Sequence, residues 1–279
     1  MTEEIGVVVV NYASGTHTLA LLESLRGRDG IGPVVVVDNS PEPDPSTRAI
    51  EAVAGVDVTV VRPGRNIGFG AGNNVGLRAL HDRGVDVAWL LNPDARVLAF
   101  TSGAVHDALR QAPDEVVLGT SVRASDRTRE GVSGLSGWTG RVCPPERAWV
   151  TFVNGSSMVV RVRELLALGG FDESYFLYCE EPDLALRTSP PGARPVTVPE
   201  LCVSHDGGGS TGSRRDVSRS TVTAYHANRS MVLLFARFRR TRLPAVVVAR
   251  SVGGLVALCR EPAVGRSWLR GLGSGLVAA

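Results

Sequence analysis

Carboxylates occur at two places where they could bind a metal ion or accept a proton. The first is Asp94, which follows the apolar run at residues 89–91 after Asn92 and Pro93. A buried strand that ends on a carboxylate, with proline preventing a helix, delivers a negative charge to the rim of a sheet. Ligands of open α/β sheets bind at the carboxyl ends of the strands. We therefore expect Asp94 to contact a divalent metal ion.

A single aspartate needs partners to hold a metal. Mg²⁺ and Mn²⁺ prefer oxygen ligands and leave positions open for water and phosphate, and histidine suits Mn²⁺ in particular. His205 follows the apolar residues 202–203 and precedes a glycine-rich stretch, which places it at a strand end. A histidine at such a place is otherwise structural or simply exposed. We predict Asp94 and His205 as the metal ligands, with phosphate oxygens and waters completing the site once a nucleotide diphosphate binds.

The second group is Glu180, Glu181 and Asp183, three carboxylates within four residues. Like charges so close raise one another's pKa, which suits a general base. The alternative is a helix N-terminus rich in acids, with Pro182 in its first turn. The two interpretations are compatible with one another.

The elements that carry these residues follow an α/β pattern. Apolar, β-branched runs predict buried strands, and they alternate with helical segments over about the first 95 positions. The predicted strands are residues 5–10, 33–37, 56–61 and 87–91, with helices at 18–25, 46–53 and 73–83. This alternation predicts an α/β fold with a doubly wound, mostly parallel sheet flanked by helices. Further along we predict helices at 105–111, 163–168 and 222–238, strands at 116–119 and 194–198, a strand pair within 150–162, and an irregular excursion at 121–146.

Two loops at strand ends have the composition of a nucleotide site. Asp38 ends the second strand and could accept a hydrogen bond from the imide of uracil or thymine, or else simply form a turn. The glycines of residues 66–70 let the backbone approach a ligand closely. Asn73 and Asn74 begin a helix whose N-terminus favours an anion, although an ordinary capped helix would look the same.

Two common nucleotide-binding classes are excluded by their motifs. The loop after the first strand, residues 11–15, has no G-x-G-x-x-G, and in the later stretch 68–73 Asn73 replaces the last glycine. The chain has no lysine, so a P-loop cannot form. Dinucleotide-dependent hydride transfer and P-loop ATP hydrolysis are therefore disfavoured.

The net charge of +2 conceals an asymmetry between the two ends of the chain. Residues 1–204 contain 18 Arg and 25 Asp or Glu, whereas residues 205–279 contain 12 Arg and 3 acids. A basic, apolar helical extension is predicted at 239–279, where the apolar run 243–259 is shorter than a membrane span and contains Arg250. The acidic N-terminus does not resemble a signal peptide, and four cysteines without CxxC spacing fit a reducing, cytoplasmic setting.

The motifs together resemble the family 2 glycosyltransferases of the GT-A fold, most closely their bacterial rhamnosyltransferase-like branch. The matching stretches occur in the family's order over roughly residues 5–235. They are residues 7–12, 36–40, 66–74, 91–94, 154–156, 169–173, 178–184 with Arg187, and His205 with Ser210.

The resemblance implies roles for individual residues. Asp38 resembles the base-binding aspartate, Asp94 the last residue of the metal motif, and His205 the late metal ligand. Glu181 occupies the place of the general base, which is usually aspartate, and Glu180 is the alternative. The nucleotide-sugar site would comprise Asn11, Tyr12, Asp38, Asn66, Gly68, Phe69, Asn73, Asn74, Asn92 and Asp94. Acceptor contacts are expected from Trp138, Asn154, Gly155 and Arg187, and residues 207–220, with Arg214 and Arg215, could close as a lid.

The implied activity is an inverting, Mn²⁺- or Mg²⁺-dependent transfer of a sugar from a dTDP- or UDP-sugar to an acceptor hydroxyl. The acceptor is a lipid-linked saccharide or a soluble glycoside. A nucleotidyltransferase and a non-catalytic nucleotide-sugar binding module are the alternatives from other classes. The expected domains are 1–238, divided into a nucleotide-binding half (1–100) and an acceptor-binding half (101–238), and the extension 239–279. We expect no nucleic acid partner and a peripheral membrane contact through the C-terminus. A homodimer is left open.

Overall fold

The computed structural model describes residues 4–42, 45–124, 127–189, 192–205 and 217–279, and its chain divides into two compact units. Unit 1 comprises Met1–Val132, Val153–Phe171 and Arg194–Ser210, and unit 2 comprises Ser133–Phe152, Asp172–Ala193 and Thr211–Ala279. Each unit is thus assembled from three segments that are distant in sequence.

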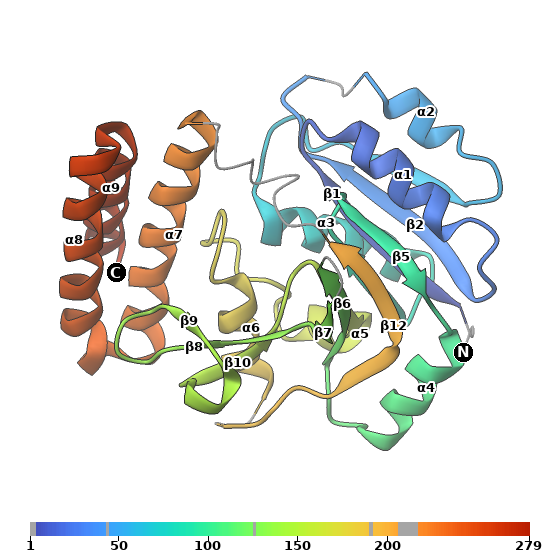
Figure 1. Ribbon diagram of the computed structural model, residues 1–279. Helices are drawn as coiled ribbons and strands as arrows, with labels where there is room; N and C mark the ends of the chain where they lie inside the picture. The colour runs from blue at the N-terminus through green and yellow to red at the C-terminus, as the bar shows by residue number, and fades with distance from the viewer. Residues whose placement is uncertain (1–3, 43–44, 125–126, 190–191, 206–216) are drawn as a thin grey trace. The chain divides into compact units, whose positions relative to one another are not determined.

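Unit 1 is built on a mixed sheet (Figure 1). Its strands are β1 (Ile5–Asn11), β2 (Ile31–Asp38), β3 (Val58–Val61), β4 (Val87–Leu91), β5 (Ala95–Ala99), β6 (Val117–Ala124), β7 (Arg127–Glu130), β11 (Ser157–Arg161) and β12 (Thr197–His205). The strand order is β3-β2-β1-β4-β11-β6-β12-β5, with β7 paired to β6. The first four strands are parallel, as predicted, but β11 runs antiparallel to both of its neighbours. The sheet is therefore mixed rather than mostly parallel.

Helices cover both faces of this sheet. They are α1 (Gly15–Leu25), α2 (Thr47–Glu51), α3 (Phe69–Asp82), α4 (Ser102–Gln111) and α5 (Val162–Ala167). Val7 and Val9 of β1 pack in one core cluster with apolar residues of α1, α2 and α4. Since successive side chains of a strand alternate, Val8 and Val10 point to the other face, where they meet α3.

Two segments differ from the prediction. The chain does not stop at Asp94 but turns into β5, which pairs with β12. Residues 121–146, predicted as irregular, contain the end of β6, β7, β8 (Val132–Leu135), β9 (Val142–Cys143) and the short helix η1 (Pro145–Arg147). The sequence of β7 is polar, and all four of its residues are exposed, so no apolar alternation marks this strand. Pairing with β6 makes it a strand.

Unit 2 combines a small sheet with helices. The sheet has the order β10-β8-β9, with β10 at Val150–Val153. The helices are α6 (Glu180–Thr188), α7 (Val217–Phe238), η2 (Arg240–Arg242), α8 (Leu243–Arg260) and α9 (Pro262–Ala278). The C-terminal region is helical, as predicted, and α9 packs closely on α7, where a Cβ at Gly271 would lie 2.2 Å from the Tyr225 carbonyl oxygen.

Candidate active site

Asn11 and Asp38 form a buried pair at one edge of the sheet in unit 1. They are opposite residues at the carboxyl ends of the parallel strands β1 and β2. The Asn11 Nδ2 donates to Asp38 Oδ1 at 3.1 Å, and the Asn11 Oδ1 accepts from the hydroxyls of Ser14 and Thr18, both at 3.0 Å. The carboxylate of Asp38 therefore has a fixed orientation. Tyr12, the next residue after β1, is 40% exposed at this edge.

Asp38 is also covered by a residue that the sequence analysis missed. Arg62 Nε lies 3.3 Å from Asp38 Oδ2, the backbone N–H of Ser40 donates to Asp38 Oδ1 at 3.1 Å, and Asp38 is only 1% exposed. A nucleotide base could reach this carboxylate only where Arg62 moves aside. Arg62 follows β3 directly, so the rule that strand ends share one edge could have identified it.

The glycine-rich loop has the conformation that glycine permits. Gly68 has φ +91°, its N–H donates to Asn66 Oδ1 at 3.0 Å, and its carbonyl accepts from Asn39 Nδ2 at 2.9 Å. The Asn39 Oδ1 is buried and has no hydrogen-bond partner among the described residues. Phe69 is the first residue of α3. Asn39, which follows β2, thus presents a buried acceptor, without a partner among the described residues, beside the buried Gly68 of the loop.

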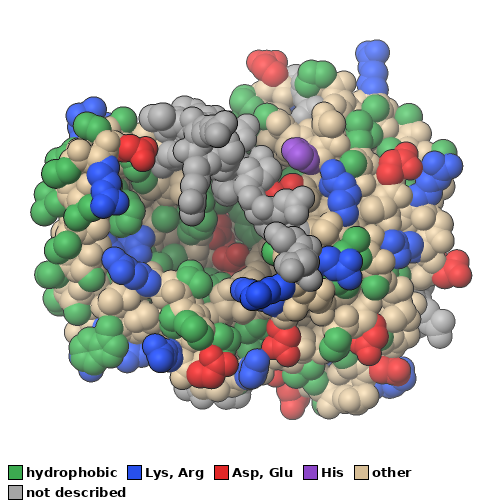
Figure 2. Space-filling model, viewed as in Figure 1, with side chains coloured by type: hydrophobic (Ala, Val, Ile, Leu, Met, Phe, Trp, Pro, Cys, Tyr) green, Lys and Arg blue, Asp and Glu red, His purple; other side chains and the backbone are tan. Residues whose placement is uncertain are grey.

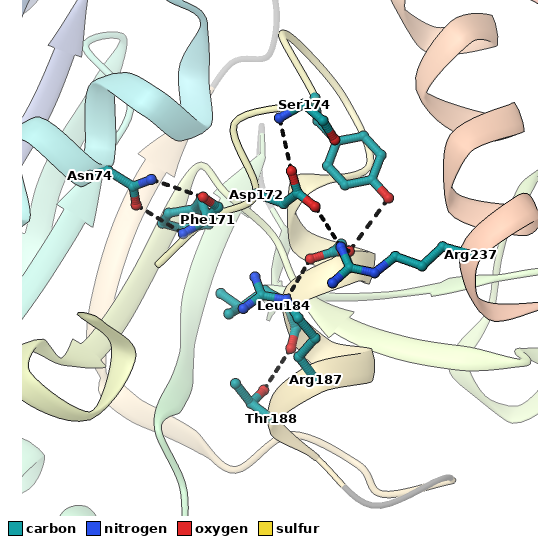
Figure 3. Close-up of polar contacts among 10 residues, drawn as sticks. Asn74, Phe171, Asp172, Ser174, Leu184, Arg187, Thr188 and Arg237 are labelled. Carbon is teal, nitrogen blue, oxygen red and sulfur yellow. Dashed lines mark hydrogen bonds and ion pairs between the residues drawn. The ribbon is translucent and has the colours of Figure 1, made fainter. Parts of the chain in front are cut away.

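Asn73 and Asn74, two of the asparagines predicted to bind the nucleotide, form hydrogen bonds within unit 1. Asn73 Nδ2 donates to the Phe69 carbonyl at 3.0 Å. Asn74 is 1% exposed, and its amide forms reciprocal 2.8 Å hydrogen bonds with the backbone N–H and carbonyl of Phe171 (Figure 3). These contacts give Asn74 a structural role, holding the segment at Gly170 and Phe171 against α3.

Asp94 lies in the turn between β4 and β5. The turn closes through a hydrogen bond from the Ala95 N–H to the Asn92 carbonyl at 3.0 Å. The Asn92 N–H donates to the Ser156 carbonyl at 3.1 Å, so the turn after β10, with the half-buried Asn154 and the buried Gly155, lies beside it. Two predicted groups, the metal motif and part of the acceptor site, are therefore neighbours within unit 1.

The backbone pairing of β12 with β5 places His205 opposite Ala95, and Ala95 directly follows Asp94 in the sequence. One carboxylate and one imidazole are a donor set that fits Mn²⁺, and the carboxylate oxygen also fits Mg²⁺. Within the described part of the chain, no group of three or more His, Cys, Asp or Glu side chains could hold a metal by itself. The side chain of His205 and the predicted lid residues Arg214 and Arg215 lie outside what the structure describes.

The acidic segment of unit 2 begins with two strained residues. Tyr178 and Cys179, immediately before α6, have φ values of +69° and +73°. Residues other than glycine adopt this region at a cost of roughly 1–3 kcal/mol each, and such strain clusters at functional sites. The strained turn directs the chain into α6 so that Glu180 and Glu181 occupy its first two positions.

Glu180 and Glu181 have different environments. Glu180 is 1% exposed, and its Oε1 has no hydrogen-bond partner among the described residues. Burial, together with the charge of Glu181, raises the pKa of Glu180 well above its ordinary value. Glu181 is half-buried. Burial therefore favours the protonated form of Glu180 and leaves Glu181 as the more accessible carboxylate of the pair.

Asp183, the third predicted catalytic acid, is held by two arginines. Its carboxylate accepts from Arg187 Nε at 2.6 Å and from Arg237 at 3.0 Å, and the Tyr175 hydroxyl lies 3.4 Å away. Arg237 also pairs with Asp172 (Figure 3). Burial raises the pKa of Asp183, while both guanidinium groups lower it in part. These contacts pair Asp183 with Arg187 and Arg237, and the catalytic role of Asp183 and the acceptor contact of Arg187 stay predictions.

Trp138, predicted to contact the acceptor, is an exposed residue of unit 2. Its side chain is 56% exposed, and the guanidinium of Arg242 stacks on its ring, 3.5 Å from the centroid. Neither Arg242 nor Arg237 was identified from the sequence. Both lie far along the chain from their partners, and no local pattern signals either contact.

Comparisons with known proteins complete the description. A scan against protein-family models gives no match. The chain is 29% identical to the N-acetylglucosaminyl-diphospho-decaprenol L-rhamnosyltransferase of Mycobacterium tuberculosis, over 81% of this chain and 82% of that protein. It is 27% identical to the rhamnosyltransferase WbbL of Escherichia coli strain K12, over 71% of this chain and 82% of that protein.

A solved structure shows the same fold. The mannosyltransferase PcManGT from Pyrobaculum calidifontis, in complex with GDP-Man and Mn²⁺, superposes with a TM-score of 0.55 at 15% identity. The match covers 98% of this chain and 87% of that one. At this level of identity the similarity is one of fold.

Proposed function

We propose that the chain, a glycosyltransferase of the GT-A fold that is similar to the rhamnosyltransferases of family 2, transfers rhamnose or another hexose from a dTDP- or UDP-sugar to an acceptor hydroxyl. We propose that this hydroxyl belongs to a lipid-linked saccharide. The observation that carries the proposal is the edge of the sheet in unit 1. There the ends of β2, β1 and β4 bring Asp38, Asn11 and the Asp94 turn into adjacent positions.

The donor half of the reaction is assigned to this edge. Asp38, oriented by Asn11, binds the base once Arg62 moves aside, and the buried Asn39 Oδ1 accepts from a donor group of the nucleotide. Asp94 and His205 would hold a divalent cation, which would supply positive charge beside the diphosphate leaving group. The motif has one acid, so cation binding depends on the nucleotide sugar.

The acceptor half is assigned to Glu181. In an inverting transfer the acceptor oxygen displaces the diphosphate in line at the anomeric carbon, and a carboxylate removes the acceptor's proton. Glu181, the more accessible of the two, supplies that carboxylate, while burial favours the protonated form of Glu180. No covalent enzyme intermediate is required, since the proton passes to Glu181 and the electron pair of the broken C–O bond leaves with the diphosphate.

A lipid-linked acceptor is supported by the M. tuberculosis relative, whose name specifies a diphospho-decaprenol carrier. Support also comes from the basic, apolar C-terminal helices, which a soluble glycoside would not need. A soluble glycoside acceptor is the alternative within the same reaction.

A thermal-shift screen of nucleotide sugars with Mn²⁺ tests the donor. At about a hundredfold excess over Kd, a cognate donor should stabilise the protein by about 2.7 kcal/mol, which is readily visible as a rise in Tm. We expect a dTDP- or UDP-sugar to give the largest shift. A shift with nucleoside triphosphates and with no nucleotide sugar would contradict the proposal and favour a nucleotidyltransferase.

A further inference from the structure

The helix α8 in unit 2 presents an apolar face to solvent. Val248, Val252, Leu255 and Val256 are 64%, 56%, 55% and 47% exposed. They are spaced three and four residues apart, so they form one stripe along the helix. We call these four residues the outer face of α8; the exposed thiol Cys259 continues it by one turn. No charged residue interrupts the stripe.

Contacts on the opposite side fix this orientation. Val246 is fully buried, and Arg250 donates to Asn228 Oδ1 at 2.7 Å and to the Gly140 carbonyl at 3.1 Å. A Cβ at Gly254 would lie 2.7 Å from Leu269. These three residues, four apart, anchor α8 to the rest of unit 2. The helix therefore cannot rotate to bury its outer face without breaking buried hydrogen bonds.

The surroundings of the outer face are strongly basic. From Arg237 to the C-terminus the sequence contains eight arginines and a single acid, Glu261. Arg240 and Arg260 are exposed at the two ends of α8, and Arg266 and Arg270 are exposed one turn apart on α9. Figure 2 shows hydrophobic and basic side chains interleaved over α8 and α9, at the left of the view.

An exposed aromatic residue accompanies the arginines. Trp138 stacks on Arg242, which directly precedes α8. Tryptophan and arginine are the side chains enriched at the boundary between lipid tails and headgroups, where an apolar body and a polar group are both accommodated.

We propose that the outer face of α8 docks on an anionic lipid bilayer, with the helix lying along the surface. By length and composition the segment Arg240–Arg260 could cross a membrane, and an 18-residue window within it has a mean hydropathy of 1.6. A crossing helix would have to give up the hydrogen bonds of Arg250, whereas a helix lying in the interface keeps them. This inference does not depend on the proposed reaction.

The charge pattern favours a bilayer over a second copy of the chain. Two copies joined through this face would bring like-charged arginines together, which opposes association. Anionic headgroups neutralise the same arginines, while the valines and leucine enter the apolar region beneath them.

Vesicle co-sedimentation of the full chain, without any sugar substrate, tests the proposal. We expect the protein to sediment with vesicles of equal parts phosphatidylcholine and phosphatidylglycerol, weakly with phosphatidylcholine alone, and less as salt is raised. The double substitution Val252→Asp with Leu255→Asp should weaken binding by about tenfold or more. The matched control is Leu168→Asp, at a 46% exposed leucine of unit 1, and it should bind like the parent protein.

A second variant separates charge from apolar contact. Arg266→Glu with Arg270→Glu should remove the preference for anionic vesicles. The proposal is overturned if the parent protein fails to bind anionic vesicles, or if either double variant binds them as well as the parent does. It is also overturned if the chain forms a dimer that Val252→Asp with Leu255→Asp dissociates while vesicles capture nothing.

Discussion

Glu180 and Glu181 are adjacent in sequence but differ in their access to solvent. At the residue scale this difference bears on the choice between Glu181, predicted from the sequence as the general base, and Glu180, the alternative. Glu180 is buried and has a raised pKa, whereas Glu181 is half-buried and is the general base that we propose. The strained turn at Tyr178 and Cys179 produces the difference, because it sets which residue begins α6.

The first prediction compares the same change at both positions. Glu181→Gln should lower kcat by about two to four orders of magnitude, the usual loss when a general base is removed, with donor binding nearly unchanged. Glu180→Gln should cost less than about tenfold, because glutamine reproduces the size of a neutral carboxylic acid. Steady-state kinetics on both purified variants measures the two losses in kcat. A larger loss for Glu180→Gln than for Glu181→Gln would assign the general base to Glu180.

The second prediction concerns stability and pH. The folded pKa of Glu180 lies above its ordinary value of 4.5, so protonation favours the folded state. This contribution is complete below the unfolded pKa and is lost as pH rises through the folded pKa. Urea unfolding from about pH 5 upward should therefore show a decline in stability that Glu180→Gln lacks. Parallel curves for the two proteins would contradict the assigned pKa.

Residue roles were predictable only where a strand end specifies the location. Asp38, Asn11 and Asp94 follow apolar runs, and the structure places all three at one edge of the sheet. The partners that define Asp38 and Asp183 are Arg62 and Arg237, and Arg237 is 54 residues from Asp183 in sequence. The strand-end rule could have located Arg62, which follows β3, but no local pattern of residue types indicates that Arg237 pairs with Asp183.

At the element scale, α3 packs closely on β1, the strand that ends at Asn11. Gly72 and Gly76 face the strand, and a Cβ at these positions would lie 2.9 Å from Val10 and 2.3 Å from Val8, respectively. The predicted close approach of a ligand concerned the glycines of residues 66–70. Gly72 and Gly76 lie beyond that stretch, within α3, and let the helix approach the strand.

The third prediction tests this contact. Gly76→Ala should destabilise the protein by about 1–3 kcal/mol, because the added methyl group overpacks the core. The control is Gly273→Ala on α9, where a Cβ meets nothing within 4 Å, and it should be neutral or stabilising by up to about 1 kcal/mol. Denaturant unfolding measures both. Equal effects would show that the approach of α3 to β1 tolerates a side chain.

The fourth prediction concerns the proposed metal site, whose candidate ligands Asp94 and His205 lie in the turn after β4 and at the end of β12. A chelator should abolish turnover, and Mn²⁺ or Mg²⁺ should restore it. Asp94→Ala should lower activity at every metal concentration. In isothermal titration with donor present, this variant should bind the metal more weakly than the parent protein does. Full activity in chelator, together with an active Asp94→Ala variant, would exclude this metal site.

At the scale of the whole molecule, the chain forms two units that each combine distant segments. The alternating strands and helices of the first 95 residues were predictable, because each repeat has its own apolar signature. The later part was less so. Strand β7 is polar and exposed, and β11 joins the sheet antiparallel between β4 and β6. These placements depend on pairing between remote segments rather than on local propensity.

The central claim is that the molecule transfers a sugar from a nucleotide diphosphate to an acceptor. The most direct test incubates the purified chain with Mn²⁺, the donor selected by thermal shift and a polyprenyl-diphosphate-linked saccharide, and follows the glycosylated lipid by mass spectrometry. We predict a product one sugar heavier, formed with the parent protein and nearly absent with Glu181→Gln. Donor binding without any such product, or equal product from Glu181→Gln, would contradict the account.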